Sequence, residues 1–262
     1  MWKRGAKRRA VVAATGLVLG ALGLEREASA QPIPTNNGDG FDTHLFRPAL
    51  DSKGFFHTNG TDILGKNDIS FGLVIDYGRG LLRTVDKGQE SANLVDHSFQ
   101  GTFSFNYGIA NILVAGLTLP LNLASGEEQF VQPTGATQVG PIAGGGNGTQ
   151  WGPNVHDFQN ASFVALHAKA RILRVERGFG LAAALQIGVP ISDAPRNGAA
   201  DPGFWYWPQL IGEKRFGSTG QFKVGANVGY RGHSASDTVI DLKDGRFRDG
   251  SRITYGLGVA YR

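Results

Sequence analysis

Eight stretches of this chain alternate between apolar and polar side chains, and each runs for about ten residues. Residues 97–108, HSFQGTFSFNYG, have the pattern without a break. Successive side chains of a β-strand point to opposite faces, so each stretch predicts a strand with one apolar and one polar face. No stretch after residue 40 has the period of 3.6 residues that an amphipathic helix requires. The chain is therefore predicted to be all-β. The other seven stretches are 68–77, 111–123, 162–173, 180–191, 204–216, 221–231 and 252–262.

Two architectures contain strands of this kind, and they differ in which face looks inward. In a soluble β-sandwich the apolar faces form the core and the polar faces meet water. In a transmembrane barrel the apolar faces meet lipid and the polar faces line the interior. A strand of about ten residues also has the length that a tilted strand needs to cross a bilayer. The alternation alone does not decide between the two architectures.

The lengths of the links between the strands favour the barrel. The links between the second and third, fourth and fifth, and sixth and seventh stretches are only a few residues long. The intervening links are long and rich in Gly, Pro, Asn, Asp and Gln. Short periplasmic turns that alternate with long external loops are typical of outer-membrane barrels. We therefore predict an antiparallel up-and-down transmembrane β-barrel of about eight strands. The long links are 78–97, 124–160, 192–203 and 232–251.

The first thirty residues have the features of a secretory signal peptide. A basic start is followed by an apolar run over residues 10–24 and then by Ala28-Ser29-Ala30, which matches an A-x-A cleavage site. We predict three parts: a leader over residues 1–30, an N-terminal periplasmic segment or plug over 31–67, and a barrel over 68–262. The leader and the barrel together predict export to the outer membrane.

The charge of the chain belongs mostly to this leader. The whole chain has 26 Lys and Arg residues, 22 Asp and Glu residues and an isoelectric point near 9.4. Without the leader, 20 residues of each sign remain, so a nucleic-acid partner loses its main support. The absence of cysteine excludes disulfides and thiolate metal sites within this sequence.

Charged side chains recur on the polar faces of the predicted strands. An eight-stranded barrel has an interior about wide enough to be filled by its own side chains. Charges in so narrow a space are stable only when they are paired and hydrogen-bonded, so we expect a network of ion pairs across the interior. The expected members are Asp68, Asp76, His167, Lys169, Arg171, Glu213, Lys223, Arg231 and Arg252.

The segments FRPALDSKGFF (46–56) and DISFGLVIDYG (68–78), with the leader and the order of loops, resemble the N-terminal transmembrane barrel of OmpA-family outer-membrane proteins. The resemblance covers about residues 68–262. It implies a barrel that is inserted by the barrel-assembly machinery and surrounded by outer-membrane lipid. We expect it without the peptidoglycan-binding domain that follows such barrels in this family.

No motif in the sequence predicts catalysis or a cofactor. His97-Ser98 and His167 invite a hydrolase interpretation. A histidine beside a serine at the junction of a loop and a strand is, however, usually a solvated pair, and His167 with Lys169 and Arg171 is more simply the basic half of the interior network. Residues 241–250 lack the ligand spacing of a calcium loop, so no metal, cofactor or catalytic residue is predicted. The expected function is a non-enzymatic structural role in the envelope with at most limited passage of small solutes. The alternatives are a porin-like channel, an outer-membrane hydrolase and a secreted β-sandwich binding module. The sequence does not indicate which molecules bind the external loops.

Overall fold

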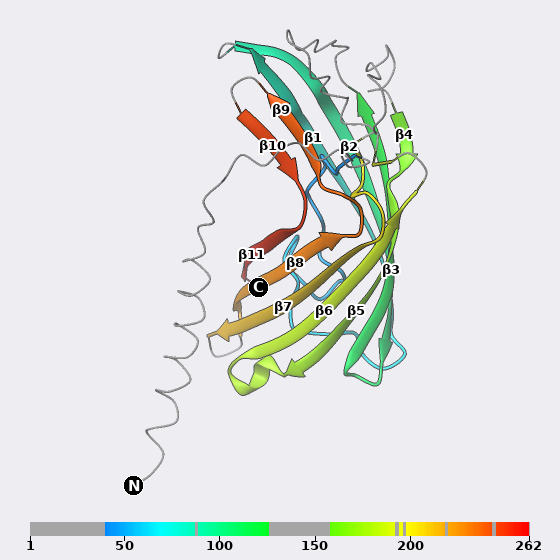
Figure 1. The fold of residues 1–262 in the computed structure, drawn as a ribbon. Coiled ribbons are helices and arrows are strands. Elements are labelled where there is room, and N and C mark those ends of the chain that lie inside the picture. The colour runs from blue at the N-terminus through cyan, green and yellow to red at the C-terminus, as the bar shows by residue number, and fades with distance from the viewer. Residues whose placement is uncertain are drawn as a thin grey trace. The chain divides into compact units, whose positions relative to one another are not determined.

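The alternating stretches of the sequence are the strands of one large antiparallel sheet (Figure 1). The computed structural model describes residues 40–86, 89–125, 158–191, 194–195, 198–217, 220–242 and 245–261. The predicted leader lies outside these residues. The elements are β1 (Ile69–Asp86), β2 (Gln89–Ile109), β3 (Leu113–Ser125), β4 (Phe158–Ala161), β5 (Phe163–Leu173), the 3₁₀ helix η1 (Val175–Arg177), β6 (Gly180–Pro190), β7 (Trp205–Phe216), β8 (Phe222–His233), β9 (Thr238–Leu242), β10 (Gly245–Asp249) and β11 (Arg252–Tyr261).

The strands follow one another around the sheet in sequence order. The order is β1-β2-β3-β5-β6-β7-β8-β11, the short strand β4 also pairs with β3, and the sheet curls through 257°. An all-β, up-and-down antiparallel architecture is thus confirmed. The expected closure is not seen, because β1 pairs only with β2 and β11 only with β8 among the described residues. The sheet is an open half-barrel.

Three of the predicted long links contain strand residues, one of them through the short strand β4. The prediction of a loop over 78–97 is wrong, since β1 and β2 continue as a paired hairpin up to Asp86 and Gln89. Backbone pairing continues there after the alternation of polarity has stopped, and polarity was the only signal for the strand. The link after β8 carries the separate hairpin of β9 and β10. Residues 126–157 of another predicted long link lie outside the described residues.

The short links are tight turns, as the sequence predicts. Between β2 and β3, Ala110 and Asn111 both have positive φ angles, 53° and 55°. Two consecutive residues of this conformation form the type I′ geometry that matches the twist of a hairpin. The Asn111 side chain also accepts a hydrogen bond from the backbone N–H of Lys66 at 2.6 Å. The turn therefore holds both the hairpin and the segment that precedes β1.

The polar faces of the strands are buried and the apolar faces are exposed. In β2, Ser98 and Gln100 are 1% and 0% exposed, whereas Phe99 and Phe103 are 49% and 45% exposed. Along the other strands of the curled sheet the outer side chains are likewise more exposed than the inner ones, and the inner residues of the edge strands β1 and β11 are mostly half-buried. Of the two arrangements that the alternation allows, the structure has the one with the polar face inward.

Residues 40–67, here called the inner segment, cover this polar face. His44 contacts Asp76 on β1, and the ring of Phe55 lies against Gly258 on β11, at the opposite end of the sheet. Thr61 contacts Glu213 on β7, between those ends. A segment that touches both ends and the middle of a curled sheet lies within its curve, as the blue and cyan coil in Figure 1 does.

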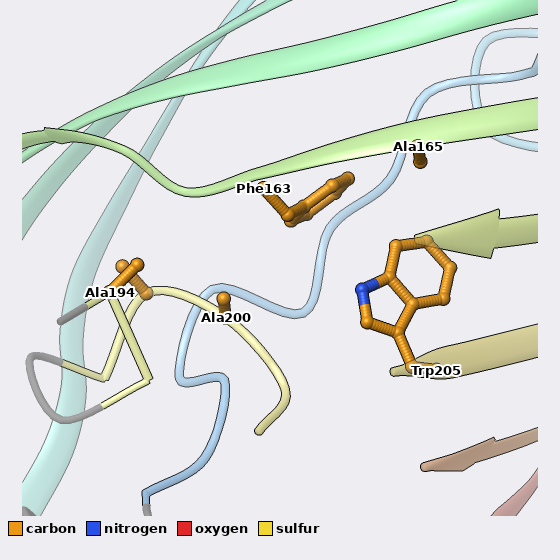
Figure 2. Close-up of a cluster of buried hydrophobic side chains, with 6 residues drawn as sticks. Phe163, Ala165, Ala194, Ala200 and Trp205 are labelled. Carbon is orange, nitrogen blue, oxygen red and sulfur yellow. The ribbon is translucent and has the colours of Figure 1, made fainter. Parts of the chain in front are cut away.

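A small apolar cluster lies on the inner side of β5 and β7. The rings of Phe163 and Trp205 meet edge to face, with centroids 5.1 Å apart, and alanines of the link between β6 and β7 pack beside them (Figure 2). An added Cβ at Gly188 would come within 2.4 Å of the Trp205 ring, so only glycine leaves space for the indole there. Two smaller clusters, around Leu50 and around Leu64, join the inner segment to the sheet.

Candidate functional site

The candidate site is the polar interior of the curled sheet together with the inner segment. Its charged side chains form three groups: an arginine–aspartate cluster, a lysine site near β5 and β7, and a histidine network on β1 to β5.

The arginine–aspartate cluster joins the inner segment to β8, β11 and the link before β7. Arg231 donates from Nε to Asp201 Oδ2 at 2.5 Å, and its Nη2 lies 3.4 Å from Asp42 Oδ2. Arg252 donates to Asp201 Oδ1 at 2.7 Å, and Arg47 forms an ion pair with Asp42. Both aspartates are buried. Each buried carboxylate therefore faces at least two guanidinium groups, which offsets the cost of removing it from water.

The pKa values of two aspartates beside Arg252, Asp201 and Asp249, move in opposite directions. Burial opposes the charge of Asp201, but Arg231 and Arg252 hold its pKa below the ordinary value. Burial raises the pKa of Asp249 to about 6, even though Arg252 lies 3.4 Å away. Asp201 is therefore a charged anchor for two arginines, whereas Asp249 takes up a proton in mildly acidic conditions.

Aromatic rings orient the arginines of the cluster. Arg231 on β8 lies 4.9 Å from the ring centroid of Trp205 and 5.5 Å from that of Trp207, both on the neighbouring β7. The two tryptophans are two residues apart and so share the inner face. Arg47 lies over the Phe163 ring at 5.2 Å. Planar guanidinium groups stack on such rings while their N–H groups stay free for carboxylates.

The lysine site ties the inner segment to β5. Lys169 is 0% exposed, and its Nζ lies 2.5 Å from Asp51 Oδ2. The same ammonium donates to the carbonyl oxygens of Asp62 at 2.7 Å and of Gly60 at 3.2 Å. The inner segment therefore accepts two hydrogen bonds from the ammonium and neutralises its charge with Asp51.

Strand β7 binds Asn59 and Thr61 of the inner segment. Glu213 accepts from the backbone N–H of Thr61 at 2.9 Å and from Nε of Arg215 at 2.9 Å. The Asn59 side chain donates from Nδ2 to Gln209 Oε1 at 3.0 Å, while its Oδ1 accepts from the backbone N–H of Leu50 at 2.8 Å. These contacts satisfy the backbone of a segment that has no regular structure of its own.

The histidine network lies on β1, β2, β3 and β5. His44 of the inner segment contacts Ser98 Oγ at 2.8 Å through Nδ1 and pairs with Asp76 through Nε2. Ser98 in turn donates to Asn122 Oδ1 at 3.0 Å. His167 contacts Asn106 at 2.7 Å and Thr118 at 3.3 Å. Among the described residues, no group of side chains could hold a metal ion.

The structure brings some of the predicted network together and leaves other members apart. Asp76, Lys169, Glu213, Arg231 and Arg252 each have an ion-pair or hydrogen-bond partner in or beside the inner segment, and His167 is bonded within the strands. The remaining three lie at the margin. Asp68 caps the backbone of Gly65, Arg171 donates to the carbonyl of Asn111, and Lys223 has no ion pair with any described residue.

The partners that the sequence analysis missed are Asp42, His44, Arg47, Asp51 and Asp201. None lies on an alternating strand, so the alternation of polar and apolar residues did not indicate them. One signal was present. The predicted network contains five Lys and Arg residues against three Asp and Glu residues, so anions from outside the strands were required.

Comparisons with protein-family models, with characterised proteins and with solved structures gave no match. Within the described residues, no helix has both the length and the apolar character needed to span a bilayer. The structure shows a large, curled antiparallel sheet whose polar interior contains paired charges.

Proposed function

We propose that this protein is a non-enzymatic, integral outer-membrane protein of the β-barrel class, with a structural role in the envelope and an interior closed to all but small solutes. The observation that carries the proposal is the inversion of the usual arrangement of faces. Large apolar side chains cover the outer face, while Gln100, Lys169 and Arg231 are buried on the inner one.

The outer apolar surface is continuous from strand to strand. A soluble monomer rarely exposes more than a few hundred Å² of contiguous apolar surface. Here every strand of the curled sheet except the short β4 contributes, so lipid is the medium that explains the surface. The exposed side chains include Phe71, Ile75, Phe103, Phe105, Leu117, Leu121, Leu166, Ile172, Leu185, Val189, Leu210, Val228, Tyr230, Tyr255, Leu257 and Val259.

An exposed charge near the end of a strand on this face fits the same environment. Lys214, near the end of β7, is exposed, and its Nζ lies 5.3 Å from the ring centroid of Phe216. A lysine at the end of a spanning strand can extend its ammonium to the interface while its stem covers an aromatic ring. At the bilayer midplane the same charge costs about 2–4 kcal/mol.

The occupied interior supports a structural role over a porin. The inner segment contacts β1, β2, β5, β7, β8 and β11 and buries the charges of the wall. The porin-like channel remains the second candidate, because ion pairs can rearrange when a segment moves.

The contacts of Ser98, His44 and Asp76 bear on the hydrolase alternative. A serine, a histidine and an aspartate meet here in series, as in a catalytic triad. Ser98 is, however, only 1% exposed, and its hydroxyl group already donates to Asn122. A nucleophile must reach a substrate carbonyl, so this trio is better explained as an anchor for the inner segment.

Membrane fractionation tests the proposal. We expect the protein in the outer membrane after carbonate washing, and we expect its gel mobility in detergent to change on boiling. A protein recovered in soluble form from the periplasm or the medium would exclude the barrel and favour a secreted binding module. Assignment to the OmpA family within this class rests on the sequence resemblance.

A further inference from the structure

The curled sheet has two free edges, β1 and β11. Each pairs with a neighbour on one side only, among the described residues. The outer side chains there are the most exposed of the sheet, with Phe71 at 79% and Tyr255 at 87%. A row of unpaired backbone groups is a template for further strands, and within lipid such a row must be paired.

The direction of the strands limits how many can fill the gap. Eight strands alternate in direction from β1 to β11, so β1 and β11 are antiparallel to each other. Only an even number of inserted strands keeps every new pair antiparallel, as in the rest of the sheet. The choices are therefore direct closure of β1 on β11, or insertion of two or four strands.

The curvature of the sheet selects among these numbers. The seven steps from β1 to β11 cover 257°, about 37° for each step. The 103° that remain to a full turn correspond to about three steps of this size, which is the space for two strands. Direct closure of eight strands requires 45° per step, and insertion of four strands requires 30°. Two inserted strands leave the observed curvature unchanged.

The inner segment bridges the two edges and leaves apolar side chains exposed beside them. His44 contacts β1, Phe55 covers Gly258 of β11, and the rings of Phe46 and Phe56 lie 5.4 Å apart. Their neighbour Leu45 is 61% exposed, and Phe56 is 67% exposed. Apolar side chains at this place fit an inner wall that continues from β11 to β1.

We propose that an amphipathic β-hairpin of a partner polypeptide inserts between β11 and β1 and completes a ten-stranded barrel. Its strands have about ten residues, matching β11, with large apolar side chains outward and small ones inward. The hairpin of β9 and β10 does not fit, because its strands have only five residues each.

A second copy of the chain does not fit this gap. Two copies joined edge to edge would make sixteen steps, so the seven steps within each copy would cover about 158° instead of 257°. That flattening would pull β1 and β11 apart and separate contacts such as His44–Asp76 and Phe55–Gly258. The need to pair both edges rests on the proposed function, because it holds within lipid. The width of the gap is measured separately from the fractionation test.

Distances between introduced cysteines in the whole protein test the width of the gap, because the natural sequence has no cysteine. One cysteine replaces Phe71 on β1, and the other replaces Tyr255, Leu257 or Val259 on β11. The matched control pair is Phe71→Cys with Leu166→Cys, which lie three ladder steps apart through Phe105 and Leu117. With spin labels, we expect the shortest β1–β11 distance to equal that control, about 14 Å between backbones.

Oxidation of the same variants identifies the competing arrangements. A disulfide within one molecule requires Cα atoms about 4–7 Å apart and would show direct closure. A disulfide between two molecules would show closure by a second copy. Either result overturns the proposal. The directly paired residues Ala226 and Leu257, both replaced by cysteine, are the positive control for disulfide formation.

A synthetic hairpin tests the occupant. The probe has two ten-residue alternating strands, and the control peptide has the same composition in scrambled order. We expect the probe to slow amide hydrogen exchange at least about tenfold in β1 and β11 and to leave the central strands β5 and β6 unchanged. Equal protection by both peptides, or none by the probe, would overturn the proposal.

Discussion

At the scale of single residues, buried charges in this protein are anchored by groups far away in the sequence. Lys169 on β5 meets Asp51, and Arg231 on β8 meets Asp42 and Asp201. A buried ion pair contributes little net stability compared with an apolar pair of the same shape, but loss of one partner leaves an uncompensated charge. Each pair therefore specifies where the inner segment docks.

Replacement of Lys169 tests this anchoring. Lys169→Met leaves Asp51 buried without its cation, and we expect the free energy of unfolding to fall by about 3–5 kcal/mol. Urea denaturation in detergent measures the loss. The double variant Lys169→Met/Asp51→Leu is expected to recover most of it. Lys223→Ala, which removes a lysine without an ion pair to a described residue, is the control. An equal loss in this control would contradict the role of the pair.

Asp249 predicts a dependence of stability on pH. Its pKa is about 6 in the folded protein against an ordinary value of 3.8, so the folded state binds a proton more tightly than the unfolded state. Its contribution to stability is therefore present at low pH and is lost as pH rises from about 4 to 6. Asp201 has a lowered pKa, so its contribution to stability is lost only as pH falls below this range.

The variant Asp249→Asn should remove this dependence. We expect it to be more stable than the parent by about 1–2 kcal/mol at pH 7.5, a value discounted for solvent screening, and nearly equal at pH 4. Urea midpoints at pH 4, 5, 6 and 7.5 give the comparison. A variant that loses stability relative to the parent as pH rises would show that the Arg252 contact outweighs the burial.

At the scale of strands, the two faces of the sheet have different surroundings. The register of the hydrogen bonds between strands keeps polar and apolar side chains on separate faces. Gly116 on β3 shows how closely the inner face packs, since an added Cβ would lie 2.3 Å from His167 Nε2 and 2.5 Å from the Phe105 carbonyl oxygen. A shift of one residue in register would bring every polar side chain of a strand to the outer face. The interior network and the apolar exterior therefore depend on the same register.

Paired substitutions distinguish the faces. Leu117→Arg introduces a charge on the outer face of β3, and we expect a cost of about 2–4 kcal/mol or a block of membrane insertion. Phe216→Arg, at the end of β7, is the control near the interface and should cost at most about 1 kcal/mol. Gln100→Ala, on the inner face, removes an acceptor of Arg47 and should cost about 1 kcal/mol. Similar effects of Leu117→Arg and Gln100→Ala on insertion into liposomes would contradict the assignment of faces.

At the scale of the whole molecule, the sheet encloses a segment of its own chain. The inner segment is held by hydrogen bonds and ion pairs to strands along the sheet, including Asn59 to Gln209 and Thr61 to Glu213. Water can replace the partners in such side-chain contacts, whereas it does not replace the backbone hydrogen bonds between the strands of the sheet. We therefore expect the wall to stay folded when the inner segment loosens.

Conductance in planar bilayers tests this occlusion. The parent protein should give little or no steady current, because the inner segment fills the interior. Asn59→Ala/Thr61→Val removes two side-chain contacts to β7, and we expect brief current openings. Arg171→Ala, at the margin, is the control without effect on current. Large, stable currents from the parent would favour the porin.

The sequence by itself determined the eight long strands of the curled sheet, their order and the difference between their faces, because the period of two is a local property of the chain. It also indicated the short turns, where Asn111 and Gly217 adopt positive φ angles. The lengths of the links also favoured the arrangement with the polar faces inward. Only the tertiary structure decided how far β1 and β2 extend and which groups neutralise the inward cations. Asp51 and Lys169 are 118 positions apart, and Thr61 and Glu213 are 152 apart. No periodicity links residues so distant. Their pairing follows from the curl of the sheet, which brings its inner face around the segment before β1.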